Sequence, residues 1–96
     1  MLRQGEVMIF KTTAIKGKKL NHLILAKGEV STHCHKITEG DAELYGEDNG
    51  VLWLKVNSPT ATLTHQEHNP QILKKGNYKI EIQKEYFPDG NKYVSD

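Results

Sequence analysis

Apolar and polar residues alternate most clearly near the C-terminal end of the chain. Residues 78–86, YKIEIQKEY, alternate over nine positions, which is the period of a β-strand with one buried face. Asn49 and Gly50 predict a hairpin, because both residues tolerate positive φ. Shorter apolar or β-branched runs, bounded by turn-forming residues, predict further strands at 6–11, 22–27, 29–37, 42–46, 51–56, 60–64 and 92–94.

The sequence predicts no helix. No segment of ten or more residues has the helical period, and Pro59 and Pro70 would break a helix at the two places where one could be tried. Many short strands with turns between them are typical of an all-β sandwich or barrel. A chain of 96 residues can bury one hydrophobic core, so we expect a single domain, 1–96.

The composition is that of an ordinary globular chain, with 26% charged and 36% hydrophobic residues. No apolar run could span a bilayer, and the first residues, MLRQGE, do not resemble a signal peptide, so we expect a cytoplasmic protein that does not enter membranes. The single cysteine, Cys34, agrees with that compartment, because it cannot form an internal disulfide. The composition does not decide between a monomer and a homo-oligomer.

Four of the five histidines form two clusters, each at a border between strand-like and turn-like sequence. In the first cluster, His33 and His35 would point to the same face of a strand and could converge on one metal ion. In the second, His65 and His68 can reach one ion only if the backbone curls after Thr64. The pattern therefore predicts a metal site at one end of a small β-barrel.

Residues beside these clusters have simpler interpretations. His22 lies in an apolar run without partners, so we interpret it as structural. Glu67 is interpreted as a second acceptor behind the ligands, or as a surface charge, rather than as a catalytic base. Strand alternation turns Cys34 away from the metal, so we expect a small buried core residue near Val30 and Ile37, neither a nucleophile nor a ligand.

The first cluster resembles a motif of the cupin superfamily. Residues 28–39, GEVSTHCHKITE, followed by Gly46, are similar to the first cupin metal-binding motif, in which a glycine precedes two histidines, a glutamate and a further glycine. The resemblance implies a jelly-roll barrel that binds iron, manganese, nickel or zinc, with Glu39 as a ligand beside the two histidines. The second cupin motif is degenerate: either Ala61 replaces its glycine, with His65 displaced, or Tyr78 stands at its histidine position.

The chain also resembles small uncharacterised bacterial and phage proteins over residues 28–94. The shared features are a G-E-x-x-x-H-x-H segment, an L-x-H-x-E-H segment and a G-x-Y turn before a basic strand. This resemblance carries no assigned activity.

Two classes of function follow from a bound metal. We expect one divalent transition metal (zinc, manganese, iron or nickel) on His33, His35 and at least one of His65 and His68, with Glu39 as a further candidate ligand. An open coordination position would indicate a metal-dependent enzyme acting on a small-molecule ligand, whereas a closed one would indicate a metal-stabilised binding or structural module. A nucleic-acid-binding barrel is a third class, which the net charge of +1 does not favour.

Overall fold

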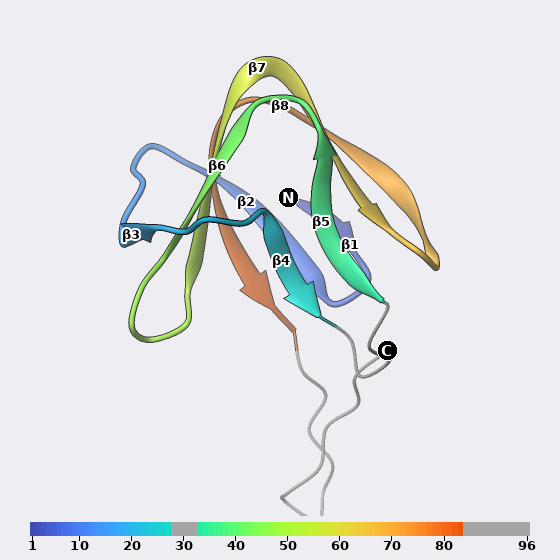
Figure 1. Ribbon diagram of the computed structural model, residues 1–96, viewed down its shortest axis with the longest axis horizontal. Helices are drawn as coiled ribbons and strands as arrows, with labels where there is room; N and C mark the ends of the chain where they lie inside the picture. Colours follow the sequence, from blue (N-terminus) through green and yellow to red (C-terminus); the bar gives the residue numbers. More distant parts are fainter. Residues whose placement is uncertain (28–32, 84–96) are drawn as a thin grey trace, which may run out of the picture.

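The computed structural model describes residues 1–27 and 33–83, and this part of the chain is all-β (Figure 1). Among the described residues no helix has the length and apolar character needed to cross a bilayer. The strands are β1 Leu2–Gln4, β2 Val7–Thr12, β3 Lys18–Lys19, β4 Ile24–Lys27, β5 Cys34–Glu39, β6 Ala42–Gly46, β7 Leu52–His65 and β8 His68–Ile82.

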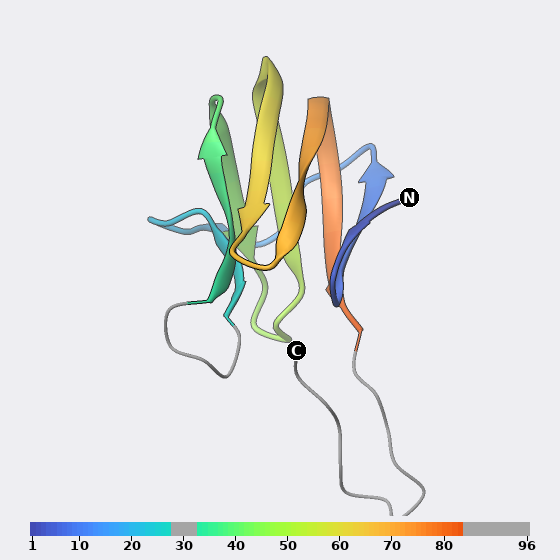
Figure 2. The same cartoon turned by 90° about the vertical axis from the view of Figure 1, so that its right-hand side faces the viewer.

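All eight strands belong to one antiparallel sheet. Six of them lie side by side in the order β1-β2-β8-β7-β5-β4, and β6 and β3 branch from β7. The first half of β7 pairs with β6, which in turn pairs with β3, and the second half of β7 pairs with β5. Because the long strands β7 and β8 bend together over the top of the molecule, the sheet curls into a half-barrel (Figures 1 and 2). The all-β class is confirmed, and the cupin-like jelly roll stays a prediction.

The inner face of the curl contains the hydrophobic core. Val7, Ile9, Leu44, Leu54, Leu63 and Leu73 are all 0–1% exposed. These residues come from β2, β6, β7 and β8, so the core joins both ends of the chain's described part. Because the sheet curls, its inner face packs against itself and forms the core. Apolar groups on the outer face are shielded from water only by neighbouring side chains of the same face.

Pro59 and Pro70 lie inside the long strands β7 and β8, so the expectation that no helix forms at these prolines is confirmed. Pro59 lies where the pairing of β7 with β8 shifts register, between Val56 and Thr60, and a proline is tolerated at such an irregularity. The predicted strands at 60–64 and 78–86 are parts of β7 and β8, while residues 84–86 and 92–94 lie outside the described residues.

The β1–β2 hairpin was not predicted, and it brings the N-terminal residues into the sheet. Gln4 pairs with Val7, so Gly5 and Glu6 form a two-residue loop. Gly5 has φ +59°, which glycine adopts without strain, and a glycine in the first position of such a loop matches the twist of the flanking strands. The loop places Gln4 and Glu6 beside strands that lie far away in the sequence.

Candidate metal centre

Three histidines meet at the end of the sheet where β5 begins and β7 gives way to β8. His35, His65 and His68 each offer one ring nitrogen within 4.8 Å of the others, and we call them the histidine cluster. The ring centroids of His35 and His65 are 4.2 Å apart, and those of His65 and His68 are 4.6 Å apart. Figure 2 shows the β7–β8 turn between β5 on one side and the β1–β2 hairpin on the other.

His65 and His68 can reach one ion only if the backbone curls after Thr64, and the structure has a tight turn there. His65 ends β7, His68 begins β8, and the two residues pair directly across a loop of Gln66 and Glu67. Side chains of directly paired residues lie on the same face of a sheet. A register shift between Leu63 and His65 precedes this pair and helps to aim both rings at His35.

His35 is fully buried, and the Gln4 side chain fixes the position of its proton. The Gln4 Nε2 donates hydrogen bonds to the carbonyl oxygens of Leu63 (3.0 Å) and Asn69 (2.8 Å). The Gln4 Oε1 must therefore accept the remaining bond, 2.9 Å long, from the His35 Nδ1–H. With the proton on Nδ1, the neutral ring has its lone pair on Nε2, which is the form that binds a metal.

A carboxylate faces that lone pair. The Oε1 of Glu6 lies 3.2 Å from the His35 Nε2, and the Glu6 side chain is only 16% exposed. A lone pair and a carboxylate oxygen repel each other at this distance unless a cation lies with them. A proton or a metal ion satisfies both atoms.

The neutral His65 ring carries its proton on the other nitrogen, Nε2. The reason is that its Nδ1 accepts a 3.0 Å hydrogen bond from the backbone N–H of Glu67. A metal on His65 must break this bond, because the ring has only one lone pair while it is neutral. A metal could therefore bind to His35 without breaking its hydrogen bond to Gln4, whereas binding to His65 would require a local change in the β7–β8 turn.

The β1–β2 loop fits closely against His68. A Cβ added to Gly5 would lie 2.7 Å from the His68 Nε2, closer than such atoms normally approach. Gly5 therefore serves two needs, the positive φ of the loop and the space for the His68 ring. The loop thus contacts the cluster at His68 and at His35.

Two of the predicted ligands lie apart from the cluster. His33 precedes β5 rather than lying in it; its ring centroid is 5.6 Å from that of His65, and its Nδ1 is 3.7 Å from a carboxylate oxygen of the exposed Glu67. Glu39 ends β5, is exposed, and accepts a 3.3 Å hydrogen bond from Thr62. Strand geometry puts Glu39 roughly 13 Å along the chain from His35, outside the cluster.

Cys34 precedes the buried His35 in β5 and so lies on the opposite face of the strand, as predicted, but it is half-buried rather than a core residue. Ile37 is buried on the same face as His35, so the expected neighbourhood of Ile37 and Cys34 was wrong. The reason is that residues two apart in a strand point to the same face, and in β5 the face of His35 and Ile37 is the buried one. Val30 lies outside the described residues, and the exposed His22 accepts a hydrogen bond from the Ile24 N–H.

Sequence reasoning missed Gln4 and Glu6. The available signal was Gly5 between two polar residues and ahead of an apolar run, which is a hairpin pattern. Nothing in the sequence near Gln4 points to Leu63 or His35, because those partners are reached only through the pairing of distant strands.

The three histidines suit a first-row divalent ion. Imidazole nitrogens are ligands that zinc, manganese, iron and nickel accept, and the Glu6 carboxylate beside His35 is of a type that these ions also accept. An ion with metal–nitrogen bonds of about 2.0–2.1 Å holds tetrahedral ligands about 3.4 Å apart, so rings whose nitrogens lie up to 4.8 Å apart need to close by roughly 1 Å. Rotation of the partly exposed His68 and the turn change at His65 can supply that movement.

Comparison with known proteins identifies the family of this chain, and the function of that family is unknown. Residues 3–83 match the model of a family described as a domain of unknown function, DUF8820, and because this match spans most of the chain, the chain belongs to that family. The matched residues include the whole histidine cluster with Gln4 and Glu6. No curated protein and no solved structure is significantly similar to the chain.

Proposed function

We propose that this member of the DUF8820 family is a metal-binding protein that holds one divalent transition metal on His35, His65, His68 and Glu6. The observation that carries the proposal is the convergence of three imidazoles, whose ring nitrogens all lie within 4.8 Å of one another. The Glu6 Oε1 lies 3.2 Å from the His35 Nε2, and Gln4 accepts the proton of the opposite nitrogen, so the His35 Nε2 and the Glu6 carboxylate can share one ion. Zinc, manganese, iron and nickel all suit such a set.

The cupin likeness belongs to the same proposal. Three histidines and one carboxylate are the ligand set which that resemblance implies, with Glu6 from the β1–β2 loop in the place of Glu39. A cytoplasmic location, where cysteine stays reduced, also belongs to the proposal.

The role that the geometry favours is to hold the sheet together. The four proposed ligands come from the β1–β2 loop, β5, β7 and β8, so one ion would cross-link strands about sixty residues apart in sequence. Binding to the folded state alone stabilises it by about 2.7 kcal/mol when the free metal is at a hundred times its Kd. Chelation should therefore lower the melting temperature by several degrees.

The test is to purify the protein without a histidine tag, reconstitute it with zinc, manganese, iron or nickel, and measure bound metal after desalting. We expect about one equivalent of at least one metal. Less than about a tenth of an equivalent of every metal would refute the proposal.

Variants at four of the five histidines locate the site. His35→Ala and His68→Ala should lose the metal, and His33→Ala should keep about one equivalent, because His33 lies outside the cluster. His22→Ala is the matched control, since it removes an exposed imidazole away from the site. Equal metal loss in His33→Ala and His35→Ala would show that the site lies nearer to the first motif than proposed.

A metal-dependent enzyme is the second candidate, favoured by the partial exposure of His68 and His33 beside the buried rings. A partly exposed ligand leaves a side from which water or a small molecule can reach the ion. Cobalt substitution distinguishes the two candidates. Strong visible absorption that azide does not change indicates a closed tetrahedral site, whereas a spectrum that azide shifts indicates an open position.

A further inference from the structure

A hollow on the surface collects most of the exposed apolar side chains of the described residues. Among residues 1–27 and 33–83 the exposed large hydrophobic residues are Met1 (73%), Leu2 (37%), Ile72 (55%) and Ile82 (39%). The first three line one hollow of about 440 Å³, whose floor is formed by the buried Ile9 and Tyr78. Apolar side chains gathered around a concave surface of this size are typical of a small-molecule site.

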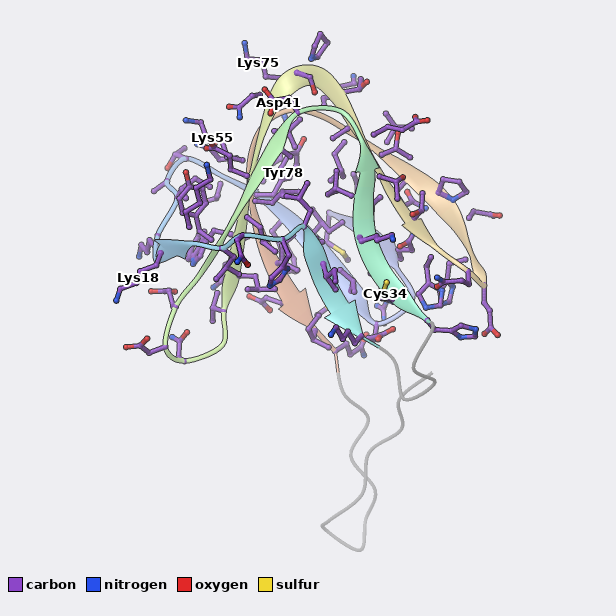
Figure 3. All side chains as sticks on the ribbon, viewed as in Figure 1. Lys18, Cys34, Asp41, Lys55, Lys75 and Tyr78 are labelled. Atoms are coloured by element: carbon purple, nitrogen blue, oxygen red, sulfur yellow. The ribbon has the colours of Figure 1, made fainter. Side chains whose placement is uncertain are left out.

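The curl of the sheet creates the hollow. Leu2 pairs with Ile9, so both side chains lie on the inner face of β1 and β2, and Ile72 comes from the first half of β8. The Tyr78 side chain lies beneath the arch of β7 and β8 (Figure 3), and its hydroxyl donates a hydrogen bond to the Lys74 carbonyl. This bond fixes the floor, so the hollow is formed before anything enters it.

Among the described residues that line the hollow, the charged side chains are those of two lysines. Lys11 lies at the end of β2, directly paired with Tyr78, and Lys74 lies on β8. Within the part of the chain that the structure describes, neither ammonium group forms a salt bridge. The lining is therefore apolar with positive charge and no negative charge, which fits an apolar molecule that carries one anionic group.

We propose that this hollow binds an alkyl carboxylate of medium chain length, with its chain on Ile9, Ile72 and Tyr78 and its carboxylate at Lys11 and Lys74. A second copy of the chain is a poorer occupant. In a twofold dimer the same surface meets itself, so the two lysines of one copy would face those of the other. The site lies apart from the histidine cluster and does not depend on a bound metal.

The test is a calorimetric and NMR titration of the full chain with hexanoate, octanoate and decanoate. Each added methylene should lower the Kd by about fourfold, because about 0.8 kcal/mol is gained per buried CH2. Octanoate should bind roughly fivefold more tightly than octan-1-ol, and octylamine should bind most weakly. Amide shifts should be largest at Leu2, Lys11 and Ile72.

Three variants locate the effect. Ile72→Asp should abolish binding without unfolding the protein, because Ile72 is 55% exposed. Lys74→Gln should weaken octanoate by roughly threefold and leave octan-1-ol unchanged. Lys75→Gln is the matched control: this lysine is exposed on the arch outside the hollow (Figure 3) and should change nothing.

Several outcomes would overturn the proposal. The first is that no binding is seen at about 10 mM decanoate, which corresponds to a negligible affinity. The second is an affinity that does not change with chain length. The third is that octylamine binds as tightly as octanoate. A dimer that Ile72→Asp converts to a monomer would show that a second copy covers the hollow. The same titration on His35→Ala separates this site from the metal site, because loss of metal should leave octanoate binding unchanged.

Discussion

The histidine cluster on the inner face and an aromatic row on the outer face are both built from neighbours on adjacent strands, yet their polar groups have different surroundings. The outer row consists of Lys19, Tyr45, Trp53 and Lys79, paired in that order across β3, β6, β7 and β8, and we call it the tryptophan row. In the row, the two lysines are exposed, so water can replace their lost partners. In the histidine cluster, protein atoms are the partners and little water is available.

Trp53 shows how the outer face is covered. Its ring is only 6% exposed, with the ammonium groups of Lys16 and Lys79 each 5.7 Å from the ring centroid and its Nε1–H donating to Glu47. The lysine stems cover the ring while their charged ends stay in water. A lost contact here costs little, whereas a lost partner of His35 leaves buried polar atoms unpaired.

The largest expected effect comes from Gln4→Leu. Gln4 is 2% exposed and makes three hydrogen bonds, to the Leu63 and Asn69 carbonyls and to His35, and leucine can replace none of them in this buried place. We expect the free energy of unfolding to fall by about 3 kcal/mol. Urea denaturation followed by circular dichroism measures this change.

Gln66→Leu is the matched control. Gln66 is exposed, and its Oε1 accepts a hydrogen bond from the Cys34 N–H, for which water can substitute. We expect a loss below about 1 kcal/mol. Equal losses in the two variants would contradict the contrast between buried and exposed hydrogen bonds.

Gly5→Ala tests the fit of the β1–β2 loop against His68. Gly5 has φ +59° and Gly50 has φ +90°, so alanine should cost about 1 kcal/mol at either position. A Cβ at Gly50 meets nothing within 4 Å, whereas one at Gly5 displaces the His68 ring. We therefore expect similar urea midpoints but roughly tenfold weaker zinc binding in Gly5→Ala alone. Unchanged zinc affinity would exclude His68 as a ligand.

The sequence predicted the strands better than the site. Residues 42–46 were predicted as a strand with the bounds of β6, because their composition and the following Asn49 and Gly50 act locally. That β7 continues through Pro59 was not predicted, since the register shift there depends on the partner strand. The site required contacts over long separations in sequence: Gln4 to Leu63, and Glu6 to His35. Local pattern can show that histidines cluster, but not which acceptor fixes each ring.

A pH titration separates two tyrosines whose pKa values are both raised, but for different reasons. The hydrogen bond to Glu43 raises the pKa of Tyr45 above its usual value, whereas burial raises the pKa of Tyr78. Their contributions to stability are complete below pH about 10, where unfolded tyrosine ionises, and are lost as the pH rises through the folded values.

Glu43→Gln should return the pKa of Tyr45 toward its usual value and leave that of Tyr78 unchanged. Phenolate absorbance, with Tyr45→Phe and Tyr78→Phe used to assign the two groups, measures both titrations. An effect of Glu43→Gln on Tyr78 would mean that the two faces of the sheet are electrostatically coupled.

The smallest expected effect is that of Lys79→Gln in the tryptophan row. This change removes a cation over the Trp53 ring and an ion pair with Glu81 at 3.3 Å, both at the surface. Exposed contacts of these kinds each contribute about 0.5 kcal/mol, and the glutamine stem keeps part of the cover over the ring. We expect a loss near 0.5 kcal/mol, a small red shift of tryptophan fluorescence, and no change in zinc binding. A loss as large as that of Gln4→Leu would show that the outer row, although exposed to water, stabilises the curl as strongly as the buried cluster does.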